Sequence, residues 1–131
     1  MDHFTYKSGE LCSETVPVSK IAAYVGTPFY LYSSATLLRH FKLFDDALEG
    51  MEHLVCYAMK AASNQAILKL LGDAGAGMDV VSGGEYKRAR AAGVPGERIV
   101  FSGVGKTRAE MEMALTGGIR QFNVEREPEM K

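Results

Sequence analysis

The sequence predicts an α/β protein in which repeated strand–helix units surround a parallel sheet, behind a separate strand–helix arm at the N-terminus. From residue 50 onward, short β-branched or aromatic runs alternate with longer amphipathic stretches. Glycines follow the amphipathic stretches, as left-handed caps do at the ends of helices. A complete (β/α)8 barrel needs about 250 residues. The chain has 131 residues, so we expect a partial TIM barrel, about its first half.

The N-terminal part of the sequence is less regular. We expect residues 1–16 to be loosely structured. Residues 27–32, Thr-Pro-Phe-Tyr-Leu-Tyr, are typical of a strand entered through a proline turn. Ser33 or Ser34 can then cap a helix that runs to about Leu48.

The barrel part is expected to contain four strands, at residues 53–59, 78–81, 98–101 and 119–124. The strand ends recur at intervals of about 20 residues, at Lys60, Ser82, Ser102 and Val124. Helices are expected to begin near Ser63, Gly83 and Lys106, and to be closed by Gly72, Gly75, Gly93 and Gly117. Residues 127–131 are typical of a new helix, because Pro128 and acidic residues favour a first turn.

Composition favours small-molecule chemistry. A net charge of −1 gives no positive field of the kind that attracts nucleic acid or acidic membranes. The two cysteines, Cys12 and Cys56, show neither a disulfide framework nor a metal-ligand spacing. No apolar run is long enough for a membrane span, and the start lacks the order of a signal peptide. We therefore expect a cytoplasmic protein with a 47% hydrophobic composition sufficient for a core, and no metal site.

Lys60 is the most informative strand-end residue. Strand alternation places it on the same side as Ala58, Cys56 and Leu54, which are small or apolar. Burial disfavours the charged form of an amine, and a neutral amine is the nucleophile that forms an imine with an aldehyde cofactor. Without further information the residues favour the other explanation, a lysine that marks the exit of the strand into solvent, and spacing alone does not settle the question.

Two motifs at a fixed separation resemble those of a known family. They are Tyr57-Ala58-Met59-Lys60-Ala61 followed by Ser63-Asn64, and Met78-Asp79-Val80-Val81-Ser82-Gly83-Gly84-Glu85. The similarity continues through Arg98-Ile99-Val100-Phe101-Ser102-Gly103 and Lys106-Thr107. Together they resemble the pyridoxal-phosphate-dependent decarboxylases of the alanine-racemase-like fold, which act on diaminopimelate, ornithine or arginine. The Ser-Gly-Gly-Glu version is similar to the diaminopimelate branch.

The resemblance implies roles for three residues. Lys60 carries pyridoxal 5'-phosphate, and Asp79 lies near the cofactor and the lysine, where a carboxylate can hold the amine or the pyridine ring. Glu85 is implied only weakly, as a support for Asp79 or Lys60. Without the family, Asp79 is equally well explained as a helix cap, and Glu85 as an exposed first-turn residue that complements the helix dipole. Ala62 departs from the asparagine that the family usually has there, which puts the geometry of this loop in doubt.

The resemblance also implies what the whole protein does. The full-length parent is expected to decarboxylate meso-2,6-diaminopimelate to L-lysine, with residues 1–26 as an N-terminal arm and residues 27–131 as an incomplete cofactor-binding barrel domain. The C-terminal half barrel and a β-domain are expected to be absent, so these 131 residues alone should have little or no activity. Uncovered strand edges favour a homodimer or higher self-association.

Three alternatives remain open from the sequence. One is an ornithine, arginine or carboxynorspermidine decarboxylase of the same fold. Another is a non-catalytic barrel protein that binds pyridoxal phosphate. The third is a structural half barrel that binds no cofactor.

Overall fold

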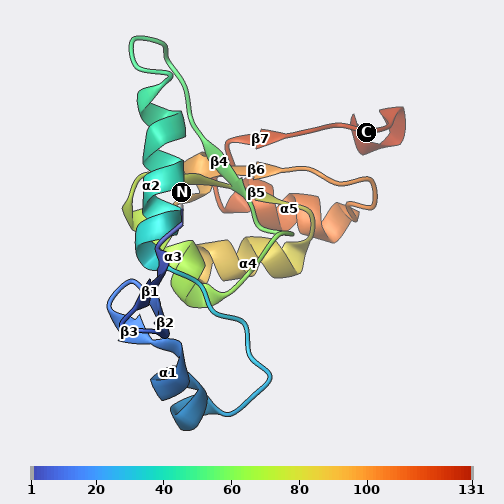
Figure 1. Cartoon of the computed structure of the whole chain (residues 1–131). Coiled ribbons are helices and arrows are strands. Elements are labelled where there is room, and N and C mark those ends of the chain that lie inside the picture. The colour runs from blue at the N-terminus through green and yellow to red at the C-terminus, as the bar shows by residue number, and fades with distance from the viewer. Residues whose placement is uncertain (1, 131) are drawn as a thin grey trace. The chain divides into compact units, whose positions relative to one another are not determined.

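The computed structural model describes residues 2–130, which form two compact units, one ending at Leu43 and one beginning at Phe44. Figure 1 shows the order of the elements along the chain. This division is one of packing and differs from the arm boundary expected after residue 26, which stays a prediction. Among residues 2–130, no helix combines the length and apolar character that crossing a membrane requires.

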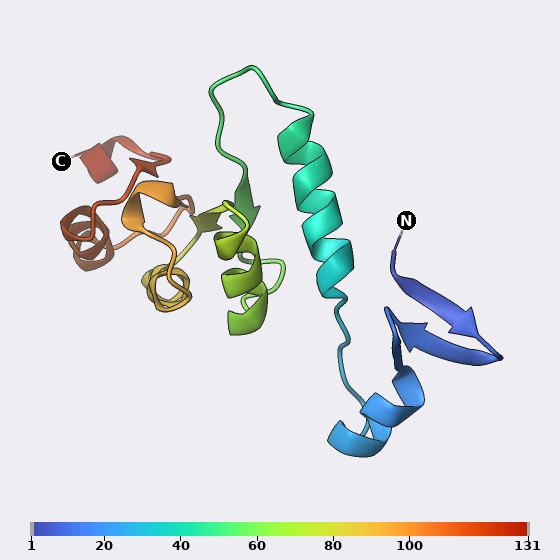
Figure 2. The same ribbon diagram turned by 90° about the vertical axis from the view of Figure 1, so that its left-hand side faces the viewer.

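The first unit begins with an antiparallel sheet of β1 (Phe4–Lys7), β2 (Glu10–Ser13) and β3 (Val16–Pro17) in sequential order. The expectation of a loose start over residues 1–16 was therefore wrong. Ser8 and Gly9 both have positive φ angles, 51° and 82°, the combination that a tight two-residue hairpin turn requires. The Ser8-Gly9 pair was the sequence feature that could have predicted this hairpin. Figure 2 shows this hairpin and α1 (Val18–Val25), which follows it.

The expected strand at residues 27–32 was also wrong, because this segment has no regular secondary structure. Its aromatic composition favours a strand only where a neighbouring strand pairs with it, and Tyr30 is instead exposed. The helix that follows was confirmed as α2 (Ser34–Asp46). Ser33 caps it by accepting a hydrogen bond from the Thr36 amide at 3.1 Å.

Glu14 ties the small sheet to the start of α2. Its carboxylate accepts hydrogen bonds from the hydroxyls of Ser33 and Ser34 at 2.8 and 2.9 Å and from the Ala35 amide at 2.9 Å. The Ala35 amide, with the two hydroxyls, lowers the pKa of Glu14, because each bond favours the ionised carboxylate.

The second unit confirms the α/β expectation. It contains a parallel sheet in the order β4-β5-β6-β7, which is the sequential order of successive βα units. The strands lie at Cys56–Ala58, Gly77–Val80, Ile99–Phe101 and Gln121–Phe122. The second is shifted by one residue from its expected position, and the other three are shorter than expected. The helices are α3 (Gln65–Asp73), α4 (Gly83–Ala91) and α5 (Arg108–Thr116), with 3-10 turns at Gly96–Arg98 and Glu127–Met130. The helix expected at residues 127–131 is thus a 3-10 turn within the described residues.

The glycines after the helices were predicted only in part. Gly75 and Gly93 have positive φ angles just beyond α3 and α4, as left-handed caps do. Gly72 lies inside α3 instead. After α5 it is Gly118, rather than Gly117, that takes the positive φ angle.

The two faces of the parallel sheet differ in burial. Figures 1 and 2 show α3, α4 and α5 along one face. On that face the register partners Tyr57 and Phe122 are half-buried. The fully buried side chains there are Met59, Met78, Val80, Ile99 and Phe101. The opposite face, which we call the open face, is half-buried and carries Cys56, Ala58, Asp79 and Val100. The core of the second unit therefore lies between sheet and helices, and polar residues collect on the open face.

Candidate active site at the C-terminal edge of the sheet

Lys60 lies in a tight turn that ends β4. The carbonyl of Ala58 accepts a hydrogen bond from the amide of Ala61 at 3.1 Å, with Met59 and Lys60 between them. The strand expected to reach Met59 therefore stops at Ala58, because the backbone turns there. Lys60 is exposed, and the Met59 amide before it still donates to the Asp79 carbonyl at 3.0 Å.

Asp79 lies on β5 directly beside this turn. Ala58 and Asp79 are register partners in the parallel pair, so Lys60 is two residues from the neighbour of Asp79. The structure thus brings the predicted lysine and aspartate to adjacent strand ends. Asp79 is part-buried on the open face, and its Oδ1 accepts a hydrogen bond from the Ser102 hydroxyl at 2.5 Å. It does not cap the next helix, because Ser82 does so by accepting from the Glu85 amide at 3.2 Å.

Glu85 has a local role at the start of α4. Its carboxylate accepts a hydrogen bond from the Val81 amide at 2.8 Å. Together with the Ser82 cap, this bond satisfies amides at the first turn of α4. The structure therefore supports the helix-start explanation of Glu85, and it places the bonded carboxylate against the backbone rather than against Asp79 or Lys60.

Three residues at the same edge were not predicted as site residues. Ser102 follows β6, Asn123 follows β7, and Gln121 lies on β7. The Asn123 side-chain amide donates to the Ser102 hydroxyl at 2.9 Å, and the Gln121 amide donates to Asn123 Oδ1 at 2.8 Å. Ser102 was visible in the sequence as a strand end, but its partner on the next strand could not be found without the sheet register.

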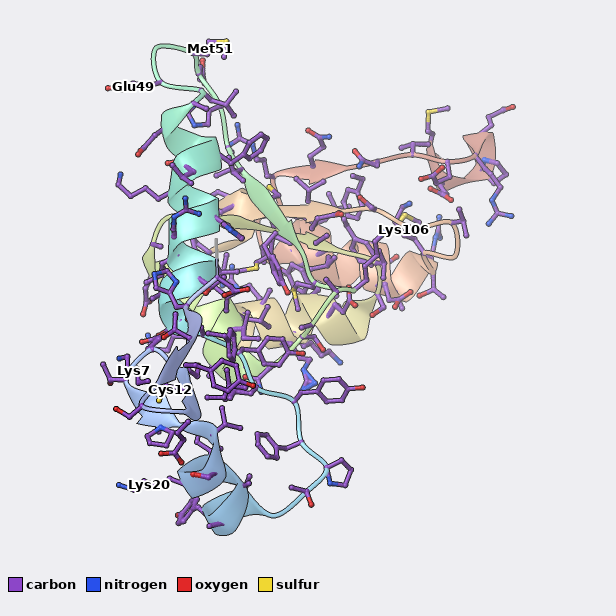
Figure 3. All side chains as sticks on the ribbon, in the orientation of Figure 1. Lys7, Cys12, Lys20, Glu49, Met51 and Lys106 are labelled. Atoms are coloured by element: carbon purple, nitrogen blue, oxygen red, sulfur yellow. The ribbon has the colours of Figure 1, made fainter. Side chains whose placement is uncertain are left out.

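Lys106 is a fully buried lysine in the loop between β6 and α5 (Figure 3). Its ammonium donates to the carbonyls of Gly103 and Asn123 at 2.5 and 2.8 Å. It also pairs with Glu129 Oε2 at 3.0 Å. The hydrogen bond from Lys106, together with the Glu125 amide, lowers the pKa of Glu129. The helix expected to start near Lys106 starts at Arg108, so Lys106 lies in the loop before it. There its hydrogen bonds connect the loop after β6 with the segment after β7.

Cys56 is the other titratable group on the open face. Burial raises the pKa of its thiol, and the negative charge of Asp79 raises it further. A thiol in this state is a poor nucleophile, because the thiolate is the reactive form. Cys56 is therefore a weaker candidate for chemistry at this edge than the predicted residues Lys60 and Asp79.

A lysine and a carboxylate at adjacent carboxyl ends of parallel strands are compatible with a site for an aldehyde cofactor. The sequence profile of the family "Pyridoxal-dependent decarboxylase, pyridoxal binding domain" matches residues 34–131. The chain belongs to this family. Its cofactor is pyridoxal 5'-phosphate, as the sequence motifs predicted.

Within the family, the chain is similar to diaminopimelate decarboxylases. It is 52% identical over 130 residues to the diaminopimelate decarboxylase of Pseudomonas fluorescens, covering 99% of this chain and 31% of the relative. A crystal structure from Aquifex aeolicus superposes with a TM-score of 0.92 at 44% identity, over 98% of this chain and 31% of that one. The diaminopimelate decarboxylase of M. jannaschii in complex with L-lysine gives a TM-score of 0.84 at 36% identity, over 94% and 30%. The chain therefore spans about a third of the length of these relatives.

Proposed function

We propose that the complete protein carrying this chain decarboxylates meso-2,6-diaminopimelate to L-lysine, and that Lys60 and Asp79 belong to its active site. One observation carries the proposal: a chain about half identical to diaminopimelate decarboxylases places the motif lysine and the motif aspartate at adjacent strand ends. The relatives' names support the choice of substrate, and the position of the two residues at adjacent strand ends supports their proposed roles.

The residues at this edge suit the cofactor. Lys60 offers a primary amine to the cofactor aldehyde, and its exposed position leaves room for a ligand. The Asp79 carboxylate, held by Ser102, can orient that amine or the pyridine ring through a charge-assisted hydrogen bond. Bound pyridoxal phosphate supplies an electron sink for the electron pair released when carbon dioxide leaves.

The protein contributes mainly orientation. Met59, next to Lys60, is fully buried between sheet and helices, so the strand end has little freedom to move. The Asp79 backbone is held in the sheet on both sides, by β4 and β6. A lysine and a carboxylate on such a frame keep their separation when substrate binds.

Substitution of Lys60 tests the proposal. The complete protein should show a near-visible absorbance band with pyridoxal phosphate, and should release carbon dioxide from meso-diaminopimelate. Lys60→Ala should abolish both. Lys69→Ala, which removes an exposed lysine paired with Asp73 on α3, is the matched control and should keep both. After borohydride reduction, peptide mass mapping should find the cofactor on Lys60, and label on another lysine would refute the assignment.

The 131 residues alone are proposed to lack turnover. Support comes from the share of the relatives that the chain spans, about a third. The purified polypeptide should release no carbon dioxide from meso-diaminopimelate under conditions where the complete protein does. Measurable turnover by the isolated chain would contradict this.

We propose that the chain associates with further copies of itself. In the second unit, β4 and β7 are the edge strands of the parallel sheet, and their outer backbone groups can pair with another chain. The isolated chain should therefore sediment as a dimer or a larger species, and a monomeric mass by light scattering would rule this out.

We also propose a cytoplasmic location, supported by the free thiols of Cys12 and Cys56, which cell fractionation can test.

A further inference from the structure

A row of hydrogen-bonded side chains crosses three strands and ends on Asp79. Gln121 Nε2 donates to Asn123 Oδ1 at 2.8 Å, and Asn123 Nδ2 donates to Ser102 Oγ at 2.9 Å. Ser102 Oγ donates to Asp79 Oδ1 at 2.5 Å. We call these four residues, Gln121, Asn123, Ser102 and Asp79, the strand-end chain.

The strand-end chain has one direction. Because the Asn123 amide oxygen receives the Gln121 amide, the Asn123 nitrogen is the group that faces Ser102. A hydroxyl has a single proton to donate. Ser102 accepts a hydrogen bond from Asn123 and donates its own hydroxyl proton to Asp79. A carboxylate accepts hydrogen bonds and donates none, which makes Asp79 the natural end of the chain.

The backbone of the strand-end chain is fastened independently of its side chains. The Ser102 amide donates to the Val80 carbonyl at 2.8 Å, and the Asn123 amide donates to the Phe101 carbonyl at 2.9 Å. The carbonyl of Asn123 receives the buried Lys106 ammonium at 2.8 Å. Ser102 and Asn123 are therefore held in place before any ligand binds.

We infer that Ser102, oriented by Asn123, is a positioning residue that fixes the rotamer of Asp79 for the chemistry at Lys60. With Oδ1 bonded to Ser102, the carboxylate keeps its other oxygen, Oδ2, to accept from a donor outside the strand-end chain. Among the described residues, no hydrogen bond reaches Oδ2, which leaves this oxygen for the amine or the ring of the cofactor site. The inference rests on the proposed function, because it assigns a role within that site.

Removal of the hydroxyl should slow the reaction more than it weakens binding. In the complete protein, Ser102→Ala should lower kcat for meso-diaminopimelate about tenfold, the effect of one charge-assisted hydrogen bond. The KM and the cofactor affinity should change by less than about threefold. Ser102→Thr restores the hydroxyl and should recover most of kcat, which a purely structural defect would not predict. Asn123→Asp keeps the size but removes the donor, and should resemble Ser102→Ala.

A second readout does not depend on activity. In the unloaded protein, NMR should show that the Asn123 side-chain amide proton bonded to Ser102 exchanges with solvent more slowly than in Ser102→Ala, although Asn123 is an exposed residue. Thr116→Val, the matched control, removes a hydroxyl that donates to the Glu112 carbonyl of its own helix. This variant should change neither the Asn123 exchange nor kcat.

The failures are distinguishable. If the wild-type protein binds no pyridoxal phosphate, the proposed function fails, and the catalytic role of Ser102 fails with it. If the wild type is active but Ser102→Ala behaves like Thr116→Val in kcat and in Asn123 exchange, the inference alone is overturned.

Discussion

Lys106 is a single residue that connects the loop after β6 with the segment after β7. Its fully buried ammonium has oxygen partners from Gly103, Asn123 and Glu129. The Glu129 side chain is itself only 5% exposed, so water reaches this pair poorly. A buried ion pair contributes little net stability when intact, but loss of one partner leaves the other uncompensated.

Lys106→Met should therefore lower the free energy of unfolding by about 2–3 kcal/mol. Methionine keeps the length and the packing of the side chain but removes the donor. Lys69→Met, at an exposed pair on α3, should change stability by less than about 0.5 kcal/mol. Urea unfolding measures both, and equal effects of the two variants would show that the buried lysine is not the fastening residue.

Gly96 is fixed by close packing rather than by its φ angle. A Cβ added there would lie 2.1 Å from the Gly117 carbonyl oxygen and 2.7 Å from that of Gly118, and both obstacles are backbone. Gly96→Ala should therefore destabilise the fold by about 2 kcal/mol or more. Gly105→Ala is the matched control, since a Cβ there meets nothing within 4 Å. A melting temperature of Gly96→Ala equal to that of the control would contradict the packing explanation.

Single residues of the site differed in how well the sequence predicted them. Lys60 and Asp79 belong to motifs, so their positions at strand ends followed once the strands were placed. Ser102 was predicted only as a strand end and Asn123 was not singled out, because each has its hydrogen-bond partner on the adjacent strand. That partner depends on the register between strands, which no local pattern encodes.

At the scale of elements, helix caps determine where the helices of the second unit begin, and the sequence predicted these starts to within two residues without naming the caps. Asn64 caps α3 by accepting from the Ala66 amide at 2.9 Å, and Ser82 caps α4. Thr107 and Glu110 form a capping box on α5. By contrast, the short hairpin of β1 and β2 and the irregular segment 27–32 were mispredicted. Their structure depends on one turn and on strand pairing rather than on a long periodic pattern.

Loss of the α5 cap should be measurable. Thr107 accepts a hydrogen bond from the Glu110 amide at 3.3 Å and donates to its carboxylate at 2.8 Å. Thr107→Ala should lower the free energy of unfolding by about 1 kcal/mol. Thr116→Ala, in the last turn of the same helix, should have a smaller effect. Denaturant unfolding of the pair distinguishes the cap from the mere loss of a threonine, and equal losses would exclude the capping role.

At the scale of the whole molecule, ionised glutamates connect elements in both units. Glu14 joins the small sheet to α2, and Glu129 pairs with buried Lys106. Glu110 bonds the Thr107 amide at 2.9 Å and the Gly83 amide at 2.7 Å, which links the starts of α5 and α4. The sequence predicted the repeated βα pattern of the second unit, but it could not predict these links between distant residues.

These links make stability depend on pH in a defined direction. Hydrogen bonds lower the pKa of Glu14, Glu110 and Glu129 in the folded chain. For Glu110 the largest cause is the Thr107 amide, followed by that of Gly83. Unfolded glutamate titrates near pH 4.3. The stabilisation is therefore fully present above about that pH and is lost as pH falls through the lower folded values.

His53, in the second unit, makes stability depend on pH in the opposite direction. Hydrogen bonding to the Met51 carbonyl, with a contribution from Asp45, raises its pKa. Its stabilisation is present below the ordinary value of about 6.5 and is lost as pH rises through the folded pKa. We therefore expect maximal stability in mildly acidic solution, between these two ranges, and a steep loss below about pH 4.

Glu110→Gln tests the predicted loss of stability at acidic pH. The variant should be less stable than wild type at pH 6, and the difference should shrink as pH falls, because the wild-type carboxylate becomes protonated as pH falls through its lowered pKa. Glu112→Gln, at an exposed glutamate of the same helix, should follow the wild-type pH profile. Urea unfolding at intervals from pH 3 to pH 7 measures all three proteins. A difference between Glu110→Gln and wild type that stayed constant with pH would show that the side chain stabilises by packing rather than by its charge.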